Sequence, residues 1–204
     1  MSKLMEYISS QCGNPRGIVG KVCCMVMNKM NQTMYKRTVS LVDVEPGEKV
    51  LDIGYGNGYL LRALDQKKNL DLYGVDISND MRLAATKRNR KADAAGRLHL
   101  SVGDCCDLIF KDETFAAVTS INTIYFWSDT VKGLSEIRRV LKPKACFYNV
   151  VYRKEYLDTL KFTESGFKKF EPKMLVELGR QAGFRKIRVR SIVRGKSYVV
   201  IYKK

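Results

Sequence analysis

The chain is poor in the residues from which most protein metal sites are built. It contains a single histidine, His99, and none of its six cysteines stands in a Cys-x-x-Cys pair. The cysteines are Cys12, Cys23, Cys24, Cys105, Cys106 and Cys146. Because structural zinc sites need closely spaced Cys or His ligands, no metal is expected. Two adjacent pairs also make a poor disulfide framework. We therefore interpret the thiols as small buried side chains, with thiol chemistry or soft-metalloid binding as the alternative.

Long hydrophobic runs are also missing. No segment approaches the roughly 20 apolar residues that cross a bilayer, and the N-terminus lacks the apolar core of a signal peptide. Hydrophobic residues make up 45% and charged residues 28% of the 204 residues, which is typical of one globular domain with or without an appendage. These features predict a cytoplasmic protein.

Acidic residues are scarce relative to basic ones. The formal net charge is +16, and residues 153–204 hold 15 Lys or Arg against 5 Asp or Glu. A solvated surface is the simplest interpretation of this C-terminal excess. A weak contact with an anionic partner, either RNA or a membrane surface, is the alternative.

Short apolar runs alternate with helical patterns from residue 48 onward. We expect strands at 49–53, 70–75, 98–102, 115–120 and 146–151, and helices at 58–64, 79–95, 130–141 and 172–182. Residues 187–193 and 198–202 flank Arg194-Gly195 and predict a closing hairpin. This order predicts an α/β fold, in which a mostly parallel sheet has helices on both faces and an antiparallel C-terminal hairpin.

Residues 1–47 carry helical patterns and no strand pattern. A helix is expected over 20–35, where the side chains at one helical spacing are mostly apolar. They are Val22, Met25, Val26, Lys29, Met30 and Met34. We expect most of the methionines Met25, Met27, Met30 and Met34 to pack the helix onto the sheet, with one of them as a candidate for a ligand pocket. The chain is therefore divided into an N-terminal helical lid, 1–47, and a core domain, 48–204.

The most informative segment is a glycine-rich turn after the first strand. It reads Asp52-Ile53-Gly54-Tyr55-Gly56-Asn57-Gly58, with glycine at every second position. Glycine is needed where backbone turns sharply or a ligand comes close. A dinucleotide-binding fingerprint has its third glycine one residue later, so this spacing argues against a dinucleotide. In a parallel sheet the ligand also meets the residues that end the neighbouring strands, which here are Asp76, Asp104 and Asn122.

Five segments, in order, resemble the motifs of the class I methyltransferases that use S-adenosylmethionine (SAM), and in particular their type 11 group. The glycine turn resembles the first motif, and residues 74–81 resemble G-x-D-x-S-x-x-M. Val102-Gly103-Asp104 resembles the family's "GD" loop. Residues 134–143 are similar to L-x-E-x-x-R-V-L-K-P, and residues 178–184 end in the similar A-G-F step. Lys144 departs from the family, which has glycine after the proline.

The resemblance implies a Rossmann-like, seven-stranded sheet, SAM as cofactor and S-adenosylhomocysteine as product. It also implies that Asp76 binds both ribose hydroxyls and that Asp104 contacts the adenine amino group. The cofactor-binding residues expected from it are Asp52, Gly54, Tyr55, Gly56, Asn57, Gly58, Asp76, Ile77, Ser78, Met81, Gly103, Asp104, Cys105 and Asn122.

The acceptor pocket is expected beside the cofactor, between the N-terminal helices and the loop after the fourth strand. Its expected residues are Tyr35, Tyr125, Phe126 and Trp127, although one or two of the three consecutive aromatics should be core residues. We predict transfer of a methyl group from SAM to a small-molecule acceptor by in-line displacement, with catalysis mainly by positioning.

No catalytic base is evident in the sequence. His99 lies in the middle of the third expected strand, and we interpret it as structural. Two alternatives to a small-molecule methyltransferase stay open. One is a methyltransferase that acts on RNA or on a membrane lipid or quinone through the basic C-terminal face. The other is a SAM-binding protein without catalysis.

Overall fold

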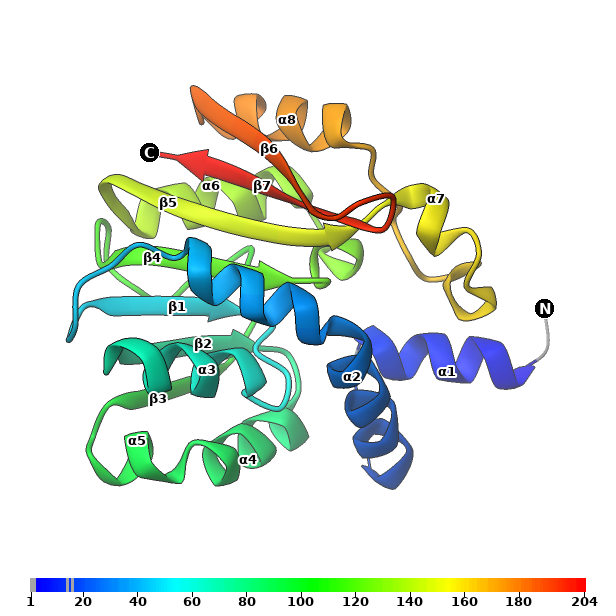
Figure 1. Cartoon of the computed structure of the whole chain (residues 1–204), viewed down its shortest axis with the longest axis horizontal. Helices are drawn as coiled ribbons and strands as arrows, with labels where there is room; N and C mark the ends of the chain where they lie inside the picture. Colours follow the sequence, from blue (N-terminus) through cyan, green and yellow to red (C-terminus); the bar gives the residue numbers. More distant parts are fainter. Residues whose placement is uncertain (1–2, 14, 16) are drawn as a thin grey trace.

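The structure, a computed structural model, describes residues 3–13, 15 and 17–204. These residues form a seven-stranded sheet in the order β3-β2-β1-β4-β5-β7-β6 (Figure 1). The strands are β1 (Lys49–Ile53), β2 (Asp71–Asp76), β3 (Leu98–Val102), β4 (Phe115–Ile121), β5 (Leu141–Tyr152), β6 (Lys186–Val193) and β7 (Ser197–Lys203). Strands β1 to β5 pair in parallel, and β7 is antiparallel to both β5 and β6. The expected fold class is confirmed.

Helices cover both faces of this sheet. They are α1 (Lys3–Gly13), α2 (Gly17–Leu41), α3 (Tyr59–Lys68), α4 (Asn79–Arg88), α5 (Arg90–Ala94), α6 (Thr130–Val140), α7 (Lys154–Leu157) and α8 (Pro172–Gln181), with 3-10 turns η1 (Ile124–Phe126) and η2 (Lys161–Thr163). Helices α2 and α3 cross one face, and α6 and α8 lie on the other (Figure 1). Because both faces are covered, central strands read as continuous apolar runs, and Val50 and Leu51 of β1 are completely buried.

The helix expected over 79–95 is interrupted at Asn89, which separates α4 from α5. The Asn89 side-chain amide donates hydrogen bonds to the carbonyl oxygens of Gly58, at 3.1 Å, and Ala85, at 2.9 Å. Asn89 is 4% exposed, so these bonds satisfy a buried donor. The interruption therefore ties α4 to the end of the glycine turn, which sequence periodicity does not reveal.

Strand β5 is longer than expected because it begins at Leu141, directly after α6, and contains Pro143. Its pairing with β4 shifts register between Phe115 and Ala117, which accommodates the irregular start. Lys144 adopts a positive φ of 67°, a conformation that glycine reaches at lower cost. The departure from the family at this position is thus absorbed as a strained turn far from the candidate site.

Helix α2 extends beyond the expected 20–35, and its N-terminal half presents a different face to the sheet. The apolar residues expected to pack inward there are instead exposed: Val22 by 48%, Met25 by 61% and Val26 by 55%. Met34, farther along, is buried as expected. The inward face carries Cys24 and Asn28, which border a cavity. A helix that lines a ligand cavity does not need an apolar inner face, so the prediction of the packed face was wrong.

Candidate functional site

A cavity of about 260 Å³ lies at the carboxyl ends of the parallel strands, against helices α1 and α2. Eleven of the residues expected to bind the cofactor line it. They are Asp52, Gly54, Tyr55, Gly56, Asn57, Asp76, Ile77, Gly103, Asp104, Cys105 and Asn122. Three of the four expected acceptor residues also line it, namely Tyr35, Phe126 and Trp127. The loops that end four neighbouring strands are thus brought to one space, as expected for an α/β sheet.

Three expected cofactor residues lie behind the wall of this cavity rather than in it. Gly58 packs so closely on Asn89 that a Cβ atom would lie 2.5 Å from the Asn89 amide nitrogen. The Ser78 hydroxyl accepts a hydrogen bond from the backbone N–H of Met81, at 3.4 Å, and donates one to the carbonyl of Pro15, at 3.0 Å. Met81 itself is 1% exposed. In the structure these three residues support the loops that line the cavity, and their contact with a cofactor stays a prediction.

Tyr125 is one of the core residues expected among the three consecutive aromatics, because it belongs to a buried polar network and not to the lining of this cavity. Its hydroxyl donates to the Asn122 side-chain oxygen at 2.9 Å, and the Asn122 amide donates to the side-chain oxygen of Asn31 at 3.0 Å. The Tyr152 hydroxyl donates to the same Asn31 oxygen at 2.7 Å. The network joins α2 to the loop after β4 and holds Asn122 at a positive φ of 58°.

The three glycines of the turn serve different purposes. All have positive φ, at 68° for Gly54, 51° for Gly56 and 72° for Gly58. A Cβ atom on Gly54 would lie 2.3 Å from the Thr123 side chain, whereas one on Gly56 would meet only open space. Gly56 lines the cavity, so this open space belongs to it. Bare backbone at Gly56 is therefore available to a ligand.

Asp76 at the end of β2 is fixed by backbone donors. Its Oδ2 accepts a hydrogen bond from the N–H of Gly56 at 2.8 Å, and its Oδ1 accepts one from Ser78 at 2.9 Å. A carboxylate offers about four lone-pair sites, so Asp76 keeps acceptor capacity for a ligand beside these backbone bonds. Burial raises the pKa of Asp76, and the backbone hydrogen bonds oppose that rise. The geometry suits an acceptor of two adjacent hydroxyl groups.

Asp52 at the end of β1 is the more deeply buried carboxyl group. It is 3% exposed, and its Oδ1 accepts a hydrogen bond from the Thr119 hydroxyl at 2.8 Å. Burial raises the pKa of Asp52 to about 7, opposed by the Thr119 hydrogen bond and assisted by the nearby charge of Asp76. A cationic ligand in the cavity would favour the ionised form of this group.

Helix α2 contributes cavity residues that the sequence did not reveal. They are Cys24, Asn28 and Asn31, in addition to Tyr35 and to Met27 from the methionine series, of which one member was expected in the pocket. In chain order, their numbers differ by three, one, three and four, so they lie on one helical face, and this mixed polar stripe was the available signal. The Tyr35 hydroxyl donates to Asn28 at 3.1 Å, and the Asn28 amide donates to Asn57 of the glycine turn at 3.2 Å.

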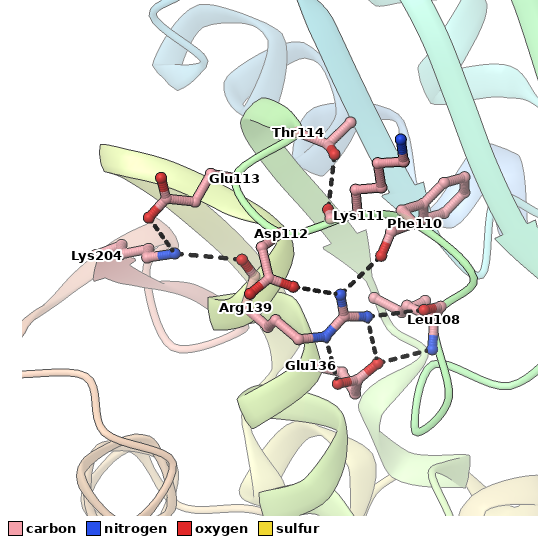
Figure 2. Close-up of polar contacts among 9 residues, drawn as sticks. All are labelled: Leu108, Phe110, Lys111, Asp112, Glu113, Thr114, Glu136, Arg139 and Lys204. Carbon is pink, nitrogen blue, oxygen red and sulfur yellow. Dashed lines mark hydrogen bonds and ion pairs between the residues drawn. The ribbon is translucent and has the colours of Figure 1, made fainter.

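The segment that follows Asp104 and Cys105 is held by the Arg139 side chain (Figure 2). Arg139 donates to the carbonyl oxygens of Leu108, at 2.8 Å, and Phe110, at 2.7 Å, and pairs with Glu136 at 2.7 Å. Glu136 also accepts a hydrogen bond from the N–H of Leu108 at 2.9 Å. Glu136 and Arg139 are the glutamate and the arginine of the L-x-E-x-x-R-V-L-K-P motif, so this motif positions the segment after the cavity loop from α6.

Comparison with known proteins reveals similarity to methyltransferases. Residues 50–144 match a family described as a methyltransferase domain. An uncharacterized methyltransferase of Bacillus subtilis, YdaC, is 29% identical over 119 residues, which cover 58% of this chain and 64% of that protein. Demethylmenaquinone methyltransferase of Thermotoga maritima is 38% identical over 117 residues, covering 56% of this chain and 48% of that protein. These matches support a methyltransferase domain over residues 50–144 of this chain.

The fold of the chain also matches a solved structure along nearly its whole length. A methyltransferase of Haloferax volcanii, solved in a complex with the Trm112 methyltransferase activator, superposes with a TM-score of 0.81. The match covers 97% of each chain at 23% identity, which supports the fold alone. The two curated relatives share less than two thirds of their own length with this chain.

The cavity is lined by acidic side chains although the protein as a whole is strongly basic. Asp52, Asp76 and Asp104 line it, and no Lys, Arg or His is among the described lining residues. His99 lies elsewhere, where its Nε2 is 2.9 Å from Asp71 and its ring stacks on Tyr73. The structural interpretation of His99 is thus consistent with its contacts. The carboxylates of the cavity therefore favour a cationic ligand locally, although the net charge of the chain is +16.

Proposed function

We propose that this protein uses SAM to methylate a small acceptor that is neutral or cationic and carries no anionic group. One observation carries the proposal: the same cavity is lined by three carboxylates, by the glycine turn and by the uncharged side chains of α2. The carboxylates suit a cationic cofactor. The uncharged stripe and the post-β4 aromatic residues suit a neutral or cationic acceptor.

The cavity residues fit SAM by their donor and acceptor chemistry. SAM would supply a methyl group on a positively charged sulfur. We assign the ribose hydroxyls to Asp76, whose oxygens are already oriented by Gly56 and Ser78. Asp52 would lie near the positively charged amino-acid portion, and Asp104 would receive the adenine amino group. Gly56 leaves room for the ligand because a Cβ atom there meets only open space.

The acceptor would lie between Asn31 and Tyr35 of α2 on one side and Phe126 and Trp127 on the other. All four residues line the cavity. Carboxylate and phosphate groups are usually bound by Arg or Lys, and the described lining holds neither. An anionic acceptor would also face the three cavity carboxylates. These features favour a neutral alcohol, phenol, thiol, amine or carbon acceptor.

The side chains around the proposed acceptor site are poor bases at neutral pH. Burial raises the pKa of Cys24 to about 11 and raises the pKa of Tyr35 above its ordinary value. Both groups therefore stay protonated near pH 7. In-line transfer would then depend on alignment by α2 and the post-β4 loop, which can lower a barrier by up to about 7–11 kcal/mol.

The proposal is tested with paired acceptors that differ only in charge. We expect S-adenosylhomocysteine to accumulate over many turnovers with some neutral amines, phenols or thiols, and not with their carboxylated or phosphorylated counterparts. Liquid chromatography of the reaction measures both products. Preferred turnover of the anionic member of a pair would contradict the charge argument. Cofactor binding without turnover of any acceptor would favour the non-catalytic alternative.

A membrane-dissolved acceptor is a second candidate because α2 exposes an apolar stripe behind the cavity wall. Its residues are Val19, Val22, Met25 and Val26, which are between 42% and 61% exposed. This apolar stripe could insert into a bilayer, and the net charge of +16 would attract the protein to an anionic one. No helix in the described part of the chain is long and apolar enough to span a membrane.

Vesicle sedimentation distinguishes this candidate from the basic C-terminal face. We expect vesicles of phosphatidylglycerol and phosphatidylcholine to bind the chain, and the double variant Val22→Ser, Val26→Ser to bind them several-fold more weakly. The matched control, Arg188→Glu with Arg190→Glu, changes two exposed residues of edge strand β6. Loss of binding in the control alone would assign the contact to the C-terminal face. Absence of binding by the unaltered chain would exclude the membrane candidate.

A further inference from the structure

Three consecutive residues after β3 bring metal-binding atoms together beside the cavity. One ligand atom from each of Asp104, Cys105 and Cys106 lies within 4.8 Å of the others. The turn is held from within, because the N–H of Cys106 donates to Asp104 Oδ1 at 2.9 Å and the N–H of Gly103 donates to the carbonyl of Asp76 at 3.0 Å. The Cys106 sulfur also lies 3.4 Å from the Ser128 hydroxyl oxygen.

The donor set determines which ions suit this turn. Two sulfur atoms and one carboxylate oxygen are preferred by thiophilic ions such as Zn²⁺ and Cd²⁺, and not by Mg²⁺ or Ca²⁺. Ligand atoms in a tetrahedral zinc site lie about 3.3–3.8 Å apart, as follows from metal–ligand distances near 2.0–2.3 Å. The present limit of 4.8 Å between the three ligand atoms exceeds that separation by about an ångström, so metal binding requires the side chains to move closer together. The Ser128 hydroxyl or a water molecule completes four ligands.

We propose that Asp104, Cys105 and Cys106 form a site for a thiophilic divalent metal ion that excludes SAM. Binding breaks two S–H bonds, forms two metal–sulfur bonds and releases two protons to solvent. The cluster keeps its net charge, since the dication replaces the two protons. The ion therefore acts by occupying the turn and not by altering the field of the cavity.

Exclusion of the cofactor follows from the position of the turn, and this part rests on the proposed function. Gly103, Asp104 and Cys105 line the cavity, whereas Cys106 is outside the lining. The Asp104 carboxylate assigned to the adenine amino group would be taken up by the ion. Metal and cofactor would thus compete for Asp104, while Cys106 would serve the metal alone. Cys106 is therefore the residue that separates the two roles.

The test is a Cd²⁺ titration of the full reduced chain, followed by ultraviolet sulfur-to-cadmium charge-transfer absorption. We expect one equivalent to bind and Cys106→Ser to weaken this binding by at least about tenfold. Cys106→Ala repeats the test in case the serine retains a metal contact. The matched control is Cys146→Ser, in β5, which should bind Cd²⁺ like the unaltered chain. Circular dichroism confirms that each variant is folded.

A competition arm separates this proposal from the proposed function. Excess SAM should weaken Cd²⁺ binding several-fold in the unaltered chain, and Cys106→Ser should retain SAM affinity within about twofold by calorimetry. Equal Cd²⁺ absorption in both Cys106 variants would overturn the site, and its loss in Cys12→Ser or Cys24→Ser would move the ion to the N-terminal helices. Cd²⁺ binding that SAM does not weaken would leave the metal site standing and contradict the cofactor placement.

Discussion

Replacement of Asp76 by Asn is expected to weaken SAM binding by about 100-fold or more. The asparagine side chain is nearly identical in shape, but its NH₂ group would face a backbone N–H of either Gly56 or Ser78, both of which donate to the carboxylate. The variant also loses one of the two charge-assisted bonds assigned to the ribose hydroxyls. Hydrogen bonds to charged groups contribute about 1.5–3 kcal/mol each, and about 1.4 kcal/mol corresponds to tenfold in affinity. The combined loss is therefore expected to weaken SAM binding by about 100-fold or more.

Isothermal titration calorimetry measures this effect, with Asp71→Asn as the matched control. Asp71 begins β2, the strand that Asp76 ends, and contacts His99 away from the cavity. We expect the control to bind SAM like the unaltered chain. Thermal unfolding without cofactor should leave Asp76→Asn folded, because burial already disfavours the charge of Asp76. Equal affinity in both variants would show that the ribose assignment is wrong.

The strands of the central sheet could be predicted from the sequence because their burial is local in origin. A strand covered on both faces must be apolar at consecutive positions, as at Val50 and Leu51, and this pattern is visible without knowledge of its neighbours. The polar residues that end the strands were equally accessible to prediction, since Asp52 and Asp76 follow such runs and Asp104 follows the Val-Gly step after the alternating strand β3. Parallel topology then brings their carboxyl ends together.

The contribution of the N-terminal helices could not be predicted in the same way. Helical periodicity in α2 indicates an apolar stripe, but does not say whether that stripe faces the core, solvent or a partner. In the structure Val22 and Val26 face outward, because the opposite face with Asn28 and Asn31 lines the cavity. Tyr125 shows the same limit, since its burial depends on Asn122, which adopts a backbone conformation that sequence does not reveal.

The second large effect is expected at Asp52, where one substitution should change stability and binding in opposite directions. Burial raises the pKa of Asp52 to about 7 in the folded chain, far above the ordinary value of an unfolded aspartate. Between these two values the folded state binds the additional proton, so the contribution of Asp52 to stability falls as pH rises from about 4 to about 7. Above pH 7 the full cost of a buried carboxylate is present, at about 2–4 kcal/mol.

Asp52→Asn should therefore raise the melting temperature of the cofactor-free chain at pH 8 by several degrees and have little effect near pH 4. The asparagine oxygen can still accept the Thr119 hydrogen bond, which is 2.8 Å long in the unaltered chain. Thermal unfolding monitored by circular dichroism across this pH range measures the effect. A lower melting temperature at pH 8 would contradict the assignment of a destabilising buried charge.

SAM affinity should respond in the opposite sense because a cationic ligand favours the ionised carboxylate. Calorimetry should show affinity rising with pH from about 6 to 8 in the unaltered chain, by at most tenfold per pH unit, and a weak, pH-independent affinity in Asp52→Asn. Thr119→Val provides the matched control, since it removes the hydrogen bond that lowers the pKa of Asp52. The pH at which SAM affinity is half-maximal should therefore be higher in Thr119→Val than in the unaltered chain. A midpoint unchanged by Thr119→Val would mean that another group controls the pH dependence, because the carboxylate that accepts this bond must titrate differently without it.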